Sequence, residues 1–94
     1  MITVLVDAEN VRRSLWPNLG RQELLKRAKA WAAREGYNVI VVFEGSQSAD
    51  DEIVGLASAH EGPLWVVTSD RELRRRVAGY ADRVIGGGSF ARTI

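Results

Sequence analysis

The stretch ITVLVDAEN, residues 2–10, decides the fold of this 94-residue chain. Its apolar and β-branched residues run without alternation, which is typical of a strand buried on both faces of a sheet. The run ends at one carboxylate, Asp7, and Asn10, a residue type that often caps helices, follows it. We therefore take Asp7 as the first candidate functional residue.

Three more segments repeat this plan. The runs NVIVVF (38–43), LWVVTS (64–69) and RVI (83–85) are short and apolar, and polar residues or glycine follow each of them. Helical sequence separates one run from the next. This βαβ order predicts an α/β fold, a three-layer α/β/α sandwich around a small, mostly parallel sheet of four strands.

The sequence between the strands predicts the helices. Apolar residues recur at helical spacing over 21–35, and Gly36 is the expected C-terminal stop. Asp50 opens a second helix, and a third begins at Ser69 or Asp70.

Shorter stretches are less regular. A helical turn is expected over 11–15, and the glycines at 86–88 are expected to form a loop after an edge strand. Trp31 lies on the apolar face of a helix and Trp65 inside a strand, so both are expected in the core. Trp16 lies in a loop beside the end of the first strand. It either packs under that loop, which is the favoured interpretation, or stacks on a nucleobase.

Composition narrows the class of protein. The net charge is +1, there is no cysteine, and the one histidine is His60. These counts exclude disulfides, thiolate metal sites, a cysteine nucleophile and a histidine-rich zinc site. No run reaches the roughly 18 apolar residues of a membrane span, and the N-terminus lacks the layout of a secretory signal. We expect one cytoplasmic domain over 1–94, a monomer or weak homodimer without a membrane partner.

The connections restrict how four parallel strands can be arranged. The order 2-1-3-4 places the longest buried strand centrally, and ligands of such open sheets bind where the winding direction reverses, at the carboxyl ends of the strands. Asp7 and Asp70 follow strands at that edge, and the helix that Asp50 opens begins there too. The acids that precede strands belong at the opposite edge and should be structural: Glu35, Glu61 and Asp82.

Converging carboxylates repel one another unless a cation compensates their charge. Oxygen ligands without histidine or cysteine favour Mg²⁺ or Mn²⁺, and such sites hydrolyse phosphodiesters by in-line displacement. Arginines that follow the first and third strands could contact the phosphate backbone: Arg12, Arg13, Arg71 and Arg74. The alternative is that the acids only offset helix dipoles and the arginines form a solvated surface.

Other uses of the same sheet edge lack their signatures. The turn DAENVR at 7–12 carries no glycines of a dinucleotide-binding loop, and the P-loop pattern is absent. A phosphoacceptor receiver domain needs a lysine late in the sheet, but the only lysines are Lys26 and Lys29, in the early helix.

Four motifs, in this order along the chain, resemble the NYN/YacP-like branch of the PIN-domain ribonucleases. They are VDAEN (6–10), SADDEI (48–53), VVTSDREL (66–73) and VIGGGSF (84–90). The resemblance extends from Ile2 to about Arg92, and it implies a PIN-like fold and a metal-dependent RNA endonuclease. Ala8-Glu9 departs from the family, whose YacP-like members often have Gly-Tyr there.

The resemblance also implies roles for particular residues. Asp7, Asp50 and Asp70 match the acids that hold the metal and carry catalysis. Asp51 is a further possible ligand, and its rank relative to Asp50 stays open. Asn10 matches an asparagine that orients Asp7 or the substrate. Supporting hydrogen-bonding positions are assigned to two more residues, Ser69 and Glu44.

The leading hypothesis is a metal-dependent endoribonuclease that hydrolyses RNA at this cluster of Asp residues. Alanine at Asp7 or Asp70 is expected to abolish cleavage and to leave the fold intact or more stable, because it relieves repulsion. A second hypothesis is a non-catalytic RNA-binding or ribosome-associated module that keeps the acids as a metal-bridged docking point, and a third is a toxin. Single-stranded DNA stays open as a substrate, because nothing identifiably reads a 2′-hydroxyl.

Overall fold

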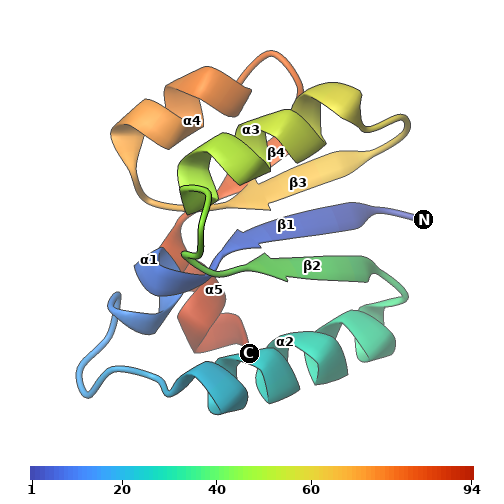
Figure 1. Cartoon of the computed structure of the whole chain (residues 1–94). Coiled ribbons are helices and arrows are strands. Elements are labelled where there is room, and N and C mark those ends of the chain that lie inside the picture. Colours follow the sequence, from blue (N-terminus) through green and yellow to red (C-terminus); the bar gives the residue numbers. More distant parts are fainter.

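The computed structural model describes residues 1–94 as three layers, a parallel sheet between two layers of helices (Figure 1). The strand order β2-β1-β3-β4 and the parallel pairing confirm the predicted topology. The strands are β1 (Thr3–Asp7), β2 (Asn38–Val42), β3 (Leu64–Val67) and β4 (Arg83–Ile85). Every residue of β1 is buried, as the apolar run without alternation at residues 4–6 predicts.

The helices divide between the two faces of the sheet. They are α1 (Ala8–Arg12), α2 (Arg21–Glu35), α3 (Ala49–Ala59), α4 (Arg71–Val77) and α5 (Gly87–Thr93). In Figure 1, α3 and α4 lie above the strands and α2 and α5 below them. The helix predicted over 21–35 is confirmed, with Gly36 in the left-handed conformation at its end.

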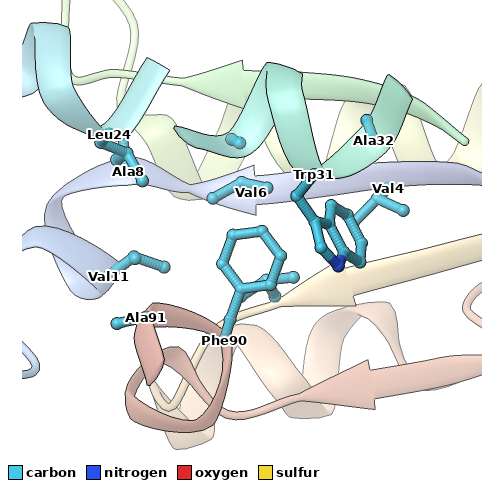
Figure 2. Packing of buried hydrophobic residues seen from close by; sticks show 11 residues of the cluster. Val4, Val6, Ala8, Val11, Leu24, Trp31, Ala32, Phe90 and Ala91 are labelled. Atoms are coloured by element: carbon cyan, nitrogen blue, oxygen red, sulfur yellow. The ribbon is translucent and has the colours of Figure 1, made fainter. Parts of the chain in front are cut away.

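Each face of the sheet has its own hydrophobic core. On the side of α1, α2 and α5, the ring of Phe90 lies edge-on to that of Trp31, with 5.0 Å between the ring centroids. Figure 2 shows both rings beside Val4 and Val6 of β1. Phe90 therefore fastens the last helix of the chain to the central strand.

Two local predictions are wrong. The first helix does not span 11–15 but begins at Ala8, directly after Asp7, because Ala8 and Val11 are buried in the core. The glycines at 86–88 do not form a loop, since Gly87 starts α5. Burial of Phe90 and Ala91 in that helix offsets the low helix propensity of glycine.

The three tryptophans lie in different environments. Trp31 is in the core as predicted, and Trp65 is partly buried, with the guanidinium of Arg83 4.8 Å from its ring centroid. Trp16 does not pack under its loop as favoured above, because 89% of it is exposed. No helix of the chain combines the length and the apolar content needed to cross a membrane.

Acids at the amino edge of the sheet include one clear structural residue. Asp82 Oδ2 accepts a hydrogen bond from the backbone N–H of Leu64, over 2.9 Å, and the N–H of Asp82 donates to the Leu64 carbonyl. These two bonds tie the start of β3 to the segment before β4, as predicted for an acid at this edge.

Candidate functional site

An open pocket of about 650 Å³ lies at the carboxyl edge of the sheet. It collects residues that follow β1, β2 and β3, together with residues of α3 and α5, and none of them is hydrophobic. The lining residues are Asp7, Glu9, Asn10, Arg13, Ser14, Glu44, Asp50, Ser69, Asp70, Gly88 and Arg92. The predicted convergence of acids from separate elements is therefore present.

Asp7 is the buried acid of the pocket. Only 6% of it is exposed, and the Thr68 hydroxyl donates a hydrogen bond to its Oδ2 over 2.9 Å. Burial raises the pKa of Asp7, the hydrogen bond from Thr68 opposes that rise, and the nearby charges of Asp50 and Asp70 add to it. Asp7 thus lies where a bound cation would relieve an unfavourable charge.

Thr68 is a site residue that the sequence analysis missed. Its side chain is fully buried at the end of β3, where its hydroxyl also accepts a hydrogen bond from the backbone N–H of Asp70 over 3.1 Å. One hydroxyl thereby positions the two acids that follow neighbouring strands. The available signal was a polar β-branched residue closing an otherwise apolar strand.

Asp50 lies on the first turn of α3 and faces the pocket, as its helical position predicts. Its pKa is raised by burial first and then by the charges of Asp70 and Glu44. Glu44 also contacts this helix directly, because its Oε1 accepts a hydrogen bond from the N–H of Ala49 over 3.2 Å. Glu44 therefore holds the start of α3 against the end of β2.

Asp51, the neighbour of Asp50, lies outside the pocket. Its carboxylate accepts a hydrogen bond from Arg76 over 3.0 Å, and this bond lowers the pKa of Asp51. Of the two adjacent acids, the structure brings only Asp50 to the other carboxylates.

Asp70 belongs both to the pocket and to the start of a helix. It lines the pocket, and its Oδ1 accepts a hydrogen bond from the N–H of Leu73 over 2.8 Å. Asp70 is thus the N-cap of α4, which gives this acid a structural role in addition to its place in the pocket.

Asn10 and Ser69 line the pocket and link α1, the segment before α4, and α5. Asn10 Oδ1 accepts a hydrogen bond from the N–H of Ser69 over 2.9 Å, and Ser69 Oγ accepts one from the N–H of Gly87 over 2.8 Å. A β-carbon at Gly87 would approach Asn10 Oδ1 far more closely than real β-carbons do. Glycine at this position is what lets α5 approach α1.

The four arginines predicted to bind substrate do not all reach the pocket. Arg13 lines it, whereas Arg12 turns back to Glu9, at 2.6 Å, and to the Leu19 carbonyl, at 2.8 Å. The remaining two, Arg71 and Arg74, do not line it.

Arg92 of α5 lines the pocket and was not among the predicted residues. The sequence analysis missed Arg92 because it expected a loop at 86–88, whereas only a helix places the Arg92 side chain over Gly88.

The donor atoms of the pocket suit a hard divalent cation. Five carboxylates and one amide line it, from Asp7, Glu9, Glu44, Asp50, Asp70 and Asn10, and Glu9 is already paired with Arg12. No three acidic or histidine side chains already lie close enough together to hold one ion. Coordination of one ion by three carboxylates therefore requires side-chain rotation. At present, hydrogen bonds from the Thr68 hydroxyl and the Leu73 amide hold the carboxylates of Asp7 and Asp70.

Comparisons with known proteins identify a similar fold. No protein-family model and no curated protein matches the chain. The chain is similar to the crystal structure of Rae1 (YacP) from Bacillus subtilis (W164L mutant), with a TM-score of 0.83 and 22% sequence identity. The likeness covers 99% of this chain and 74% of that chain. It shows a shared fold.

Proposed function

We propose that this chain is a metal-dependent endoribonuclease that hydrolyses RNA phosphodiesters with Mg²⁺ or Mn²⁺ in the pocket at the carboxyl edge of the sheet. One observation carries the proposal: Asp7, Asp50 and Asp70 come from three separate elements and face the same pocket, which no hydrophobic residue lines. The motifs that resemble NYN/YacP-like ribonucleases contain these same three acids.

The electrostatics of the acids support a cation site. Burial and mutual repulsion raise the pKa values of both Asp7 and Asp50, so neutral pH keeps these groups charged only at a cost in stability. Perturbed acids gathered in a polar pocket are more typical of function than of structural support.

The side chains have distinct roles in this proposal. Asp7, Asp50 and Asp70 would hold the ion, and Glu44 would hold α3 beside them. When bound, the ion would supply an activated water and neutralise charge on the leaving oxygen. Asn10 and Ser69 would keep the wall of the pocket in place through their mutual hydrogen bond.

A calorimetric titration with Mn²⁺, together with thermal unfolding, tests the metal site. Wild type is expected to bind Mn²⁺ and to unfold at a higher temperature when it is present, and Asp7→Asn is expected to lose both effects. Glu35→Gln is the matched control, because this exposed acid ends α2 at the opposite edge of the sheet. Asp51→Asn would keep binding if only the acids of the pocket hold the ion.

Cleavage of a labelled RNA by wild type in Mn²⁺, and its absence in Asp7→Asn and Asp70→Asn, would support the nuclease directly. Activity that survives in both variants would contradict it. If neither wild type nor the variants bind Mn²⁺, the acids are only helix caps and charges at the edge of the sheet, and the metal-dependent mechanism is contradicted.

A non-catalytic RNA-binding or ribosome-associated module is the second candidate. It is favoured by the structural roles of two acids, since Asp70 caps α4 and Glu44 holds the start of α3. Salt-sensitive retention of RNA without cleavage products in Mn²⁺ would support this module. A toxin would instead arrest growth on expression, in a manner that depends on Asp7.

A further inference from the structure

Glu9 is the one acid of the pocket that already has cations beside it. Its Oε1 lies 2.6 Å from Arg12 Nη1 and 3.5 Å from Arg13 Nη2, and its Oε2 lies 3.7 Å from Arg21 Nε. Only 13% of its side chain is exposed, and Oε2 is buried without a hydrogen-bond partner. The other carboxylates that line the pocket form no ion pair. The pocket therefore has its arginines gathered on a single acid.

Of these three arginines, only Arg13 lines the pocket. Its side chain is 71% exposed, and Glu9 is its only ion-pair partner. Arg12 has a second acceptor, since its Nε donates a hydrogen bond to the Leu19 carbonyl over 2.8 Å. Removal of the charge on Glu9 would therefore free Arg13 and leave Arg12 held.

The remaining acids of the pocket attract a free cation. Burial and mutual repulsion raise the pKa values of Asp7 and Asp50, so a positive charge beside them relieves an unfavourable interaction. A guanidinium is always charged and matches a carboxylate with two parallel N–H bonds. Arg13, once freed from Glu9, would compete with a metal ion for the same carboxylates.

We propose that Glu9 is a positioning residue that holds Arg13 away from the acids of the proposed metal site and so keeps them available to the ion. This inference rests on the proposed function and adds a means of regulating the site. The chain carries its own competitor for the metal, and the ion pair with Glu9 restrains it.

A calorimetric titration with Mn²⁺ measures the competition. Glu9→Gln keeps the shape of the side chain, and we expect it to weaken Mn²⁺ binding by about 2- to 150-fold, the range of coupling between neighbours in one ion-pair network. Adding Arg13→Ala should restore most of the affinity, because the competing guanidinium is gone. If the double variant binds as weakly as Glu9→Gln, Glu9 acts through its own charge and the inference is overturned. The readout is metal binding, so contacts of Arg13 with RNA do not enter it.

Two further variants serve as controls. Glu23→Gln removes the acid from its pair with Arg27, over 2.7 Å, which has the same i,i+4 spacing as Glu9 and Arg13 but lies outside the pocket. It should bind Mn²⁺ as wild type does. Arg92 also lines the pocket, so Arg92→Ala is combined with Glu9→Gln. Affinity restored by Arg92→Ala would make Arg92 the competitor and would contradict the inference.

Urea unfolding in EDTA tests the same restraint without metal. If Arg13 served only as the partner of Glu9, Arg13→Ala would lower the urea midpoint less in Glu9→Gln than in wild type, because the pair is already broken. We expect the reverse, a larger decrease in Glu9→Gln, since Arg13 then compensates the other acids of the pocket. An equal or smaller decrease would overturn the inference.

The two experiments separate this inference from the proposed function. If wild type binds no Mn²⁺, the metal-dependent nuclease is contradicted, and urea unfolding still decides whether Glu9 restrains Arg13. If wild type and Glu9→Gln bind Mn²⁺ equally well, the inference is overturned and the proposed metal site stands.

Discussion

At the scale of single residues, Asp7 is a buried acid whose charge is costly for folding. It ends the central strand, its side chain is buried, and its partner is the hydroxyl of Thr68. A neutral hydroxyl compensates a buried carboxylate only in part. The remaining charge is what a cation in the pocket would balance.

This electrostatic cost has a testable pH dependence. Burial, with smaller contributions from Asp50 and Asp70, raises the pKa of Asp7 above its ordinary value of 3.8. The folded state then holds the proton more tightly than the unfolded state, so the stability due to Asp7 is present at low pH and is lost as pH rises through the folded pKa. We expect Asp7→Asn to gain in free energy of unfolding over wild type across that range, as urea unfolding at a series of pH values would show.

Asp51→Asn provides a control of opposite sign. The hydrogen bond from Arg76 lowers the pKa of Asp51, so its stabilisation is present above the unfolded pKa and is lost as pH falls through the folded pKa. The variant should therefore be less stable than wild type at neutral pH and equal to it in acid. The same pH trend in Asp7→Asn would contradict the account given for Asp7.

At the scale of elements, α5 depends on one close approach. A β-carbon at Gly87 would displace Asn10 and break the hydrogen bond from the N–H of Ser69, so we expect Gly87→Ala to lose about 1–3 kcal/mol of stability. In Gly88→Ala the new β-carbon meets only the flexible end of Arg92, at 3.6 Å, and stability should stay level or rise. Thermal unfolding of the two variants checks this. Equal stabilities would mean that the contact with Asn10 does not hold α5.

Two substitutions at Asp70 separate its structural role as the cap of α4 from its proposed chemical role. Asp70→Ala removes the bond to the Leu73 amide and should cost about 0.5–2 kcal/mol, whereas Asp70→Asn can still cap the helix. This replaces the expectation that alanine here leaves the fold intact. Both variants should lose cleavage in Mn²⁺.

A matched variant at another cap completes that experiment. Ser48 caps α3 by accepting a hydrogen bond from the N–H of Asp51 over 3.1 Å, and it lies outside the pocket. Ser48→Ala should lose stability to a similar extent and still cleave RNA. Loss of cleavage in Ser48→Ala would show that stability alone limits the activity.

At the scale of the whole molecule, the two edges of the sheet differ. The edge strand β4 has three residues and carries Arg83, whereas β2 has five residues, NVIVV, with no charge or proline. A long apolar edge strand can pair with another chain. The edge strand β2 is therefore the surface at which the expected monomer or weak homodimer can be tested.

We expect wild type to self-associate weakly as its concentration rises, and Ile40→Lys on β2 to remain monomeric, because a lysine on an edge strand opposes pairing. Sedimentation velocity over a range of concentrations measures this. Leu56→Lys on α3 is the control, since Leu56 and Ile40 are each 37% exposed but Leu56 is not on a strand. If both variants change association equally, exposed apolar area is responsible rather than the edge.

The sequence by itself determined the order of the elements, the parallel sheet and the placing of Asp7, Asp50 and Asp70 at one edge. These features follow from hydrophobic periodicity and from the ends of strands, which act over a few neighbouring residues. Only the tertiary structure decided that Thr68 holds Asp7, 61 positions away, and that Asn10 holds Ser69, 59 positions away. It also decided that Asp51 turns to Arg76 and that the last glycines form a helix, which brings Arg92 to the pocket. The physical reason is that a side chain at the edge of a sheet takes its direction from partners that folding brings together from distant parts of the chain.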